Sequence, residues 1–322
     1  MLRASLIVVT MAVGATAAQA EVVKDGDLRV LRIRACADDE MRERGGWAEE
    51  IQEHLAFASG IFESTFGIRF RVDEVVEWDT DDEGQGLGDL VDELEGDIPV
   101  TGVDVAVGFS AQDPRRGKLS KYVALPWGLT PSLGRVSMIR AMVDDESYDL
   151  NLAVVHEIAH LFGAFHVARQ DSVMRETVQG PRTFQFDTEN GKLIRLMRDY
   201  DFETGVEAIS PEAADRLTAL WKRGGGDVDT SPLAEAFFNR GIELYNEDKP
   251  EEAIQLWQRS IQADDQFALA YGTMGVTLAE LERYDEALKA LKQADALGWP
   301  DAKQAMWLIE WRRVAEEREG EE

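Results

Sequence analysis

The chain contains one cysteine, Cys36, among its 322 residues. No intrachain disulfide can form, so an exported protein of this sequence must be stable without one. Cys36 lies in an alternating apolar segment, which indicates a small buried side chain. A thiolate that keeps a metal site latent is the alternative, but Cys36 lacks the flanking residues associated with such a switch.

Basic residues are also scarce, with 34 Lys and Arg against 62 Asp and Glu, which gives a formal net charge of −28. A chain this acidic repels nucleic acid and anionic lipid surfaces, so we expect neither as a partner. Acidic side chains in such numbers usually lie on a solvated surface, although they could also attract positively charged substrates.

No apolar run near the N-terminus is long enough for a permanent membrane helix. Residues 1–20 combine a basic start at Arg3, an apolar run over residues 6–13 and small residues ending at Ala20. This pattern is typical of a secretory signal peptide, with an uncleaved anchor as the alternative. We therefore expect a secreted or periplasmic protein that begins at Glu21 after cleavage and has no stable membrane insertion.

Histidine is rare too, and three of the four histidines fall in the segment VHEIAHLFGAFHV. His156 and His160 are four residues apart and share one face of a helix. Gly163 can end that helix in a left-handed conformation and let the chain bring back His166. Three neutral imidazoles leave one position of a tetrahedral zinc open for water, which is the arrangement of a catalytic site.

Glu157 lies beside the first of these histidines. Zinc lowers the pKa of a bound water toward ~7, and a neighbouring carboxylate can take its proton as the water attacks a carbonyl. We therefore expect one catalytic Zn²⁺ held by His156, His160 and His166, with Glu157 as general base. A helix that carries these histidines by coincidence is the alternative. The fourth histidine, His54, is not assigned to the metal.

The pattern H-E-x-x-H-x-x-G-x-x-H resembles the zinc-binding signature of the metzincin metallopeptidases. Met174, in the sequence DSVM, is then a candidate for the methionine turn that metzincins place beneath the metal, unless it is an ordinary apolar loop residue. No tyrosine stands two residues after Met174, where the astacin branch has a further ligand. Val167 stands where the reprolysin branch typically has an aspartate, so this position does not support that branch.

The resemblance implies a zinc endopeptidase that hydrolyses protein or peptide substrates. One alternative is a catalytically inactive metalloprotease-like protein that acts as a binding or adaptor module. The intact Glu157 counts against it, because an inactive relative would be free to lose the base. A zinc hydrolase acting on a non-peptide amide is a third hypothesis, which the motif alone leaves open.

Hydrophobic periodicity predicts an α/β (α+β) domain over residues 21–223, with a mixed five-stranded sheet. The predicted strands are 28–37, 68–78, 103–109, 122–125 and 135–140, and the predicted helices are 46–66, 90–94, 150–162, 190–200 and 211–221.

The order of these elements resembles the upper subdomain of metzincins, in which an antiparallel edge strand pairs with an extended substrate. The resemblance places the substrate-binding edge at Tyr122, Val123, Ala124 and Leu125, and an exposed strand edge is a known site of peptide pairing. An ordinary edge strand is the alternative.

Residues 224–233, which begin with three glycines, predict a flexible linker. Beyond it the sequence repeats with a period of 34, and the paired positions are Phe237/Tyr271, Gly241/Gly275, Ala253/Ala287 and Trp257/Leu291. This resembles the tetratricopeptide repeat and implies an all-α domain over residues 234–322, with two repeats and a capping helix. Such repeats bind protein partners, although these could instead only buttress the protease domain.

Overall fold

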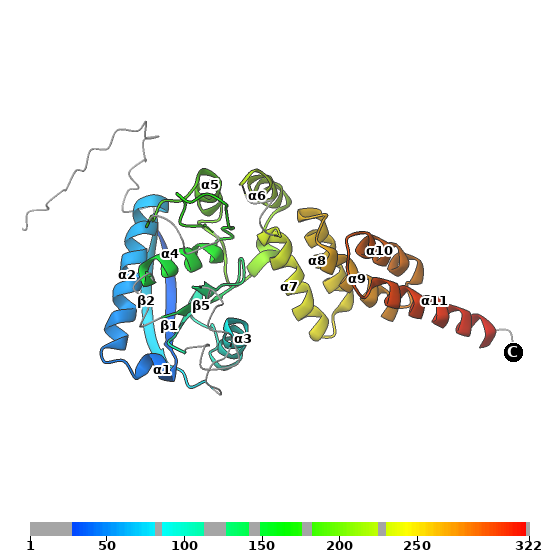
Figure 1. Cartoon of the computed structure of the whole chain (residues 1–322), viewed down its shortest axis with the longest axis horizontal. Helices are drawn as coiled ribbons and strands as arrows, with labels where there is room; N and C mark the ends of the chain where they lie inside the picture. Colours follow the sequence, from blue (N-terminus) through cyan, green and yellow to red (C-terminus); the bar gives the residue numbers. More distant parts are fainter. Residues whose placement is uncertain are drawn as a thin grey trace, which may run out of the picture.

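The computed structural model describes residues 28–80, 86–112, 127–141, 149–175, 182–224 and 230–319. Over these ranges a mixed five-stranded sheet carries helices on both faces and is followed by an all-helical region (Figure 1). The predicted fold class is therefore confirmed. The predicted signal peptide and the predicted strand at 122–125 lie outside the described residues and stay predictions.

The sheet has the strand order β2-β1-β3-β5-β4. Four strands run parallel: β1 (Arg29–Ala37), β2 (Ile68–Glu77), β3 (Val105–Ser110) and β5 (Val136–Arg140). The antiparallel strand, β4 (Gly128–Leu129), pairs with β5 at the edge. β4 lies between the predicted strands at 122–125 and 135–140, where we predicted no strand, because a strand of two residues is too short for any alternation to show in the sequence.

Helices α1 (Asp39–Arg42), α2 (Trp47–Phe66) and α4 (Leu150–Leu161) contribute to the larger core on one side of the sheet. Helix α3 (Leu87–Asp97), which is longer than the predicted helix at 90–94, packs on the other side in a smaller cluster that includes Cys36. Cys36 is fully buried, as expected, and burial raises the pKa of its thiol to about 12.

After the sheet come α5 (Thr188–Leu196), the 3₁₀ turn η2 (Gly205–Ala208) and α6 (Pro211–Gly224). The helical region then contains α7 (Pro232–Asn246), α8 (Pro250–Ala263), α9 (Ala268–Glu280), α10 (Tyr284–Ala296) and α11 (Ala302–Glu319). Helix α7 begins inside the predicted linker, because the Ser231 side chain caps the helix and Pro232 suits its first turn.

Two glycines let the helices of the helical region pack closely. A β-carbon on Gly241 of α7 would lie 2.8 Å from Cδ1 of Trp257 in α8, and one on Gly275 of α9 would lie 2.8 Å from Cγ of Leu291 in α10. The residues paired by the 34-residue period thus make equivalent contacts in the two helix pairs.

The helical region shares one continuous core with the sheet domain. Leu193 of α5, Trp221 of α6 and Leu233 of α7 line the same small apolar cavity. Arg259 of α8 donates a hydrogen bond of 2.8 Å to the carbonyl of Ile209, which precedes α6. In the described part of the chain, no helix combines the length and the apolar character needed to cross a membrane.

Candidate metal centre

Helix α4 carries His156 and His160 on one face. Asp149 caps the start of the helix, and its side chain accepts hydrogen bonds from two backbone amides of the first turn. From Leu152 to Leu161 every residue is buried, so core packing fixes the helix. His54 lies outside the site, as expected, with its Nδ1 2.8 Å from Oδ1 of Asn151.

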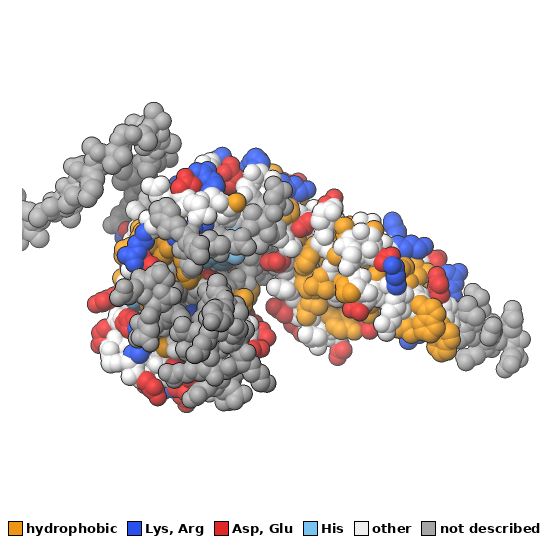
Figure 2. Space-filling model, viewed as in Figure 1, with side chains coloured by type: hydrophobic (Ala, Val, Ile, Leu, Met, Phe, Trp, Pro, Cys, Tyr) orange, Lys and Arg blue, Asp and Glu red, His pale blue; other side chains and the backbone are white. Residues whose placement is uncertain are grey.

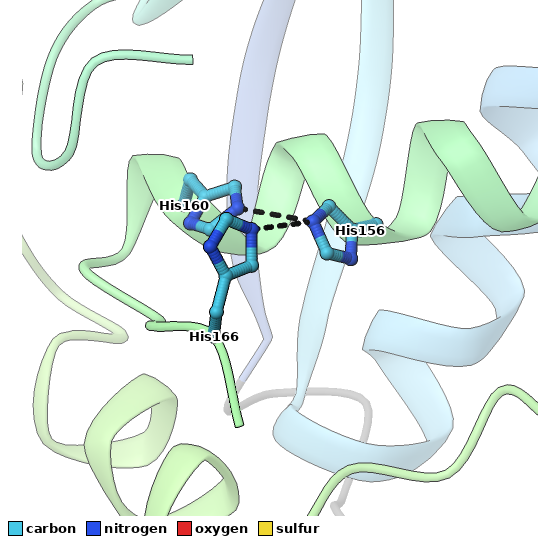
Figure 3. A group of neighbouring side chains, drawn as sticks. All are labelled: His156, His160 and His166. Atoms are coloured by element: carbon cyan, nitrogen blue, oxygen red, sulfur yellow. Dashed lines mark hydrogen bonds between the residues drawn. The ribbon is translucent and has the colours of Figure 1, made fainter. Parts of the chain in front are cut away.

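Gly163 ends this helical segment as the sequence predicts. Its φ of +80° lies in the left-handed region, and its amide donates a 2.8 Å hydrogen bond to the His160 carbonyl. A β-carbon at this position would also lie 3.1 Å from Cδ2 of Leu133, so glycine suits both the turn and the packing. The chain then reverses and returns His166 to the face of α4 (Figure 3).

The structure brings the three predicted histidines together. Nε2 of His156 lies 3.2 Å from Nε2 of His160 and 3.2 Å from Nε2 of His166, as the dashed lines in Figure 3 show. Tetrahedral zinc with bonds of about 2.0–2.1 Å separates its ligand atoms by about 3.3–3.4 Å. The nitrogen positions therefore fit one zinc ion.

Backbone carbonyls set the orientation of two rings. Nδ1 of His156 lies 2.8 Å from the Val173 carbonyl oxygen, and Nδ1 of His160 lies 2.7 Å from that of Ala164. With Nδ1–H donating, each Nε2 keeps its lone pair for a metal. Burial, with a further contribution from His166, lowers the pKa of His156 to about 3, so this ring is neutral at physiological pH.

Glu157 is buried beside the histidines, and burial raises the pKa of its carboxyl to about 7. Oε2 of Glu157 accepts a 2.8 Å hydrogen bond from Thr130 Oγ1, which lies 2.7 Å from Oγ of Ser137. The backbone of Gly128 packs against the same side chain, since a β-carbon there would lie 2.6 Å from Cγ of Glu157. Sequence reasoning missed Thr130 and Gly128 because both lie between the predicted strands at 122–125 and 135–140, where no element was predicted.

The turn predicted at residues 171–174 is present, and Met174 is fully buried. The Met174 carbonyl accepts a 2.9 Å hydrogen bond from the Val167 amide, so the turn lies alongside the segment that carries His166. The Trp127 ring meets the His156 ring edge-on at 5.5 Å between centroids. The predicted substrate edge, Tyr122 to Leu125, directly precedes Pro126 and Trp127 in the sequence but lies outside the described residues.

Comparison with known proteins gives one family. A reprolysin-type family model, described as metallo-peptidase family M12, matches residues 27–196, more than half of the chain. No curated protein matches. Among solved structures, archaemetzincin from Methanopyrus kandleri is 15% identical and similar over 55% of this chain and 99% of its own, with a TM-score of 0.40. A structure described as a chaperone–substrate complex is 11% identical, with coverage of 54% and 36% and a TM-score of 0.40.

Proposed function

The chain belongs to metallo-peptidase family M12, and we propose that it is a secreted or periplasmic zinc endopeptidase with Glu157 as general base. The observation that carries the proposal is the convergence of three Nε2 atoms beside the buried Glu157. The family model that matches is of reprolysin type, although Val167 stands where that branch typically has an aspartate. The Val167 side chain is buried, which favours an apolar residue at this position. Its backbone amide pairs with the 171–174 turn.

His156, His160 and His166 would hold the zinc. When bound, the metal supplies a Lewis acid that lowers the pKa of a water and polarises the scissile carbonyl. Glu157 takes the proton of the attacking water and passes it to the leaving amine. The Thr130 hydroxyl holds one carboxylate oxygen in place for this transfer.

The substrate is proposed to be an extended peptide bound along the antiparallel edge of the sheet. β4 is that edge in the described residues, and residues 122–125 precede it closely in sequence. Main-chain pairing at a strand edge leaves side chains free to enter pockets, which gives sequence preference. Met174 is proposed to support the histidines from below, as the methionine turn does in metzincins.

We further propose that the helical region is a pair of tetratricopeptide repeats with α11 as a cap. Antiparallel helix pairs and the matching close approaches at Gly241 and Gly275 support this assignment. A cavity of about 330 Å³ between α7 and α9 is lined by residues that include Ile242, Tyr245 and Trp299. Figure 2 shows hydrophobic side chains gathered on the helical region, where a protein partner would bind.

The test combines metal analysis with digestion of a peptide library by wild type and Glu157→Gln. We expect zinc in both proteins and a loss of cleavage of about 10²–10⁴-fold in the variant, because the general base is removed while the histidines stay. Glu53→Gln, an exposed change of the same kind in α2, is the matched control and should cleave normally.

A wild-type protein in which metal analysis finds no zinc would refute the proposal. Zinc in both proteins with cleavage by neither would favour the inactive adaptor protein, and cleavage of non-peptide amides alone would favour a different hydrolase.

A further inference from the structure

Two buried side chains at the start of α5 reach the backbone segments that support the histidines. We propose that Asp187 and Asn190 are positioning residues that hold His156 and His166 in the geometry that binds zinc. This inference rests on the proposed function, because it assumes that the three histidines are the zinc ligands.

Asn190 holds the residue before His166. Its Oδ1 accepts a 2.9 Å hydrogen bond from the Phe165 amide, and its Nδ2 donates one of 2.9 Å to the Phe165 carbonyl. One side-chain amide thus pairs with both backbone groups of Phe165, as a neighbouring strand would. His166 lies after the end of α4, outside the helical hydrogen bonding that fixes the other two histidines. This clamp therefore supports the chain just before His166, as the hydrogen bond from the Val167 amide to the Met174 carbonyl does just after it.

Asp187 holds the turn that orients His156. Its Oδ2 accepts hydrogen bonds of 2.8 Å from Ser172 Oγ and 2.8 Å from Asn190 Nδ2. Ser172 Oγ in turn accepts a 3.1 Å hydrogen bond from the Met174 amide. Between these two residues lies the Val173 carbonyl, which is the 2.8 Å partner of His156 Nδ1.

A helix cap alone does not explain this arrangement. As the cap of α5, Asp187 uses Oδ1, which accepts a 3.0 Å hydrogen bond from the Asn190 amide. Its other oxygen is committed to the turn and to the Asn190 side chain. Asp187, Asn190 and Ser172 are all buried, where hydrogen bonds to a carboxylate are strong and geometrically restrictive. Removing groups that orient metal-binding histidines typically weakens metal binding by about 10–100-fold.

The experiment measures the zinc dissociation constant by competition with a chelator, and the melting temperature of the metal-free protein. Asn190→Ala removes the clamp on Phe165. Asp187→Asn can keep the cap through its remaining oxygen but loses an acceptor for Ser172 and Asn190. We expect each change to raise the zinc dissociation constant about 10–100-fold. Ser210→Ala is the matched control, because Ser210 Oγ accepts a 3.2 Å hydrogen bond at the start of α6 only.

A purely structural role gives a different result. Both variants would then lower the melting temperature of the metal-free protein while the zinc dissociation constant stays within about twofold of wild type, as for Ser210→Ala, and the inference would be overturned. If neither variant folds, Ser172→Ala decides, since it removes one hydroxyl from the same network, and unchanged zinc affinity there overturns the inference. Wild type that binds no zinc refutes the proposed function itself.

Discussion

Replacing Gly128 by alanine tests how Glu157, the proposed general base, is held. A β-carbon at residue 128 would lie 2.6 Å from Cγ and 2.7 Å from Cδ of Glu157, and it would also meet the backbone carbonyl of Met138. Carbon atoms normally approach to about 3.5–4.0 Å, so either the Glu157 side chain or β4 must move by roughly 1 Å. Overpacking of this kind costs about 1–3 kcal/mol of stability.

We expect Gly128→Ala to lower kcat/KM for peptide hydrolysis about 10²-fold, because a misplacement of about 1 Å has that effect on catalytic groups. Zinc affinity should stay close to wild type, since the change leaves the carbonyl partners of His156 and His160 in place. The control is Gly60→Ala in α2, where an added β-carbon would meet nothing within 4 Å. This substitution should stabilise the helix by about 0.5–1 kcal/mol, because alanine favours the helix more than glycine does. A Gly128→Ala protein with wild-type kcat/KM would refute the reasoning.

Three further changes test the packing. Because burial raises the pKa of Cys36 from 9.0 to about 12, its contribution to stability should be constant below about pH 9 and fall between about pH 9 and pH 12. Denaturant unfolding across that range should show a shallower alkaline loss in Cys36→Ala; identical slopes would contradict this. Gly241→Ala should cost about 1–3 kcal/mol in denaturant unfolding, because the new methyl group meets Trp257, and an unchanged midpoint would refute the packing. A chain ending at Gly224 loses the packing of Leu233, which should lower its stability by about 1.5–3 kcal/mol for that side chain alone. Its melting temperature should therefore fall. An unshifted melting curve would show that the sheet domain folds independently.

The metal ligands could be predicted because their geometry is local. His156 and His160 are related by the helical repeat, and Gly163 turns the chain within three residues, so their spacing alone specifies the convergence. Long periodic elements were predicted for the same reason: the helix expected over residues 46–66 is observed at Trp47–Phe66.

The groups around the ligands could not be predicted, because they meet only after folding. Thr130 and Glu157 are 27 residues apart, and Asn190 and Phe165 are 25 apart. Neither pair lies in a repeating pattern, and Gly128 sits in a strand of two residues. A threonine between two strands or an asparagine at the start of a helix looks like many others until the tertiary contact shows which group it binds.

Helix α5 joins the metal site to the helical region. At its start, Asp187 and Asn190 bond to the turn and to the segment that carries His166. One turn further along, Leu193 faces a small apolar cavity that Trp221 of α6 and Leu233 of α7 also line. Any movement of α7 away from this cavity would therefore leave one side of α5 without its packing partners. The helical region thus belongs to the same core as the elements around the histidines.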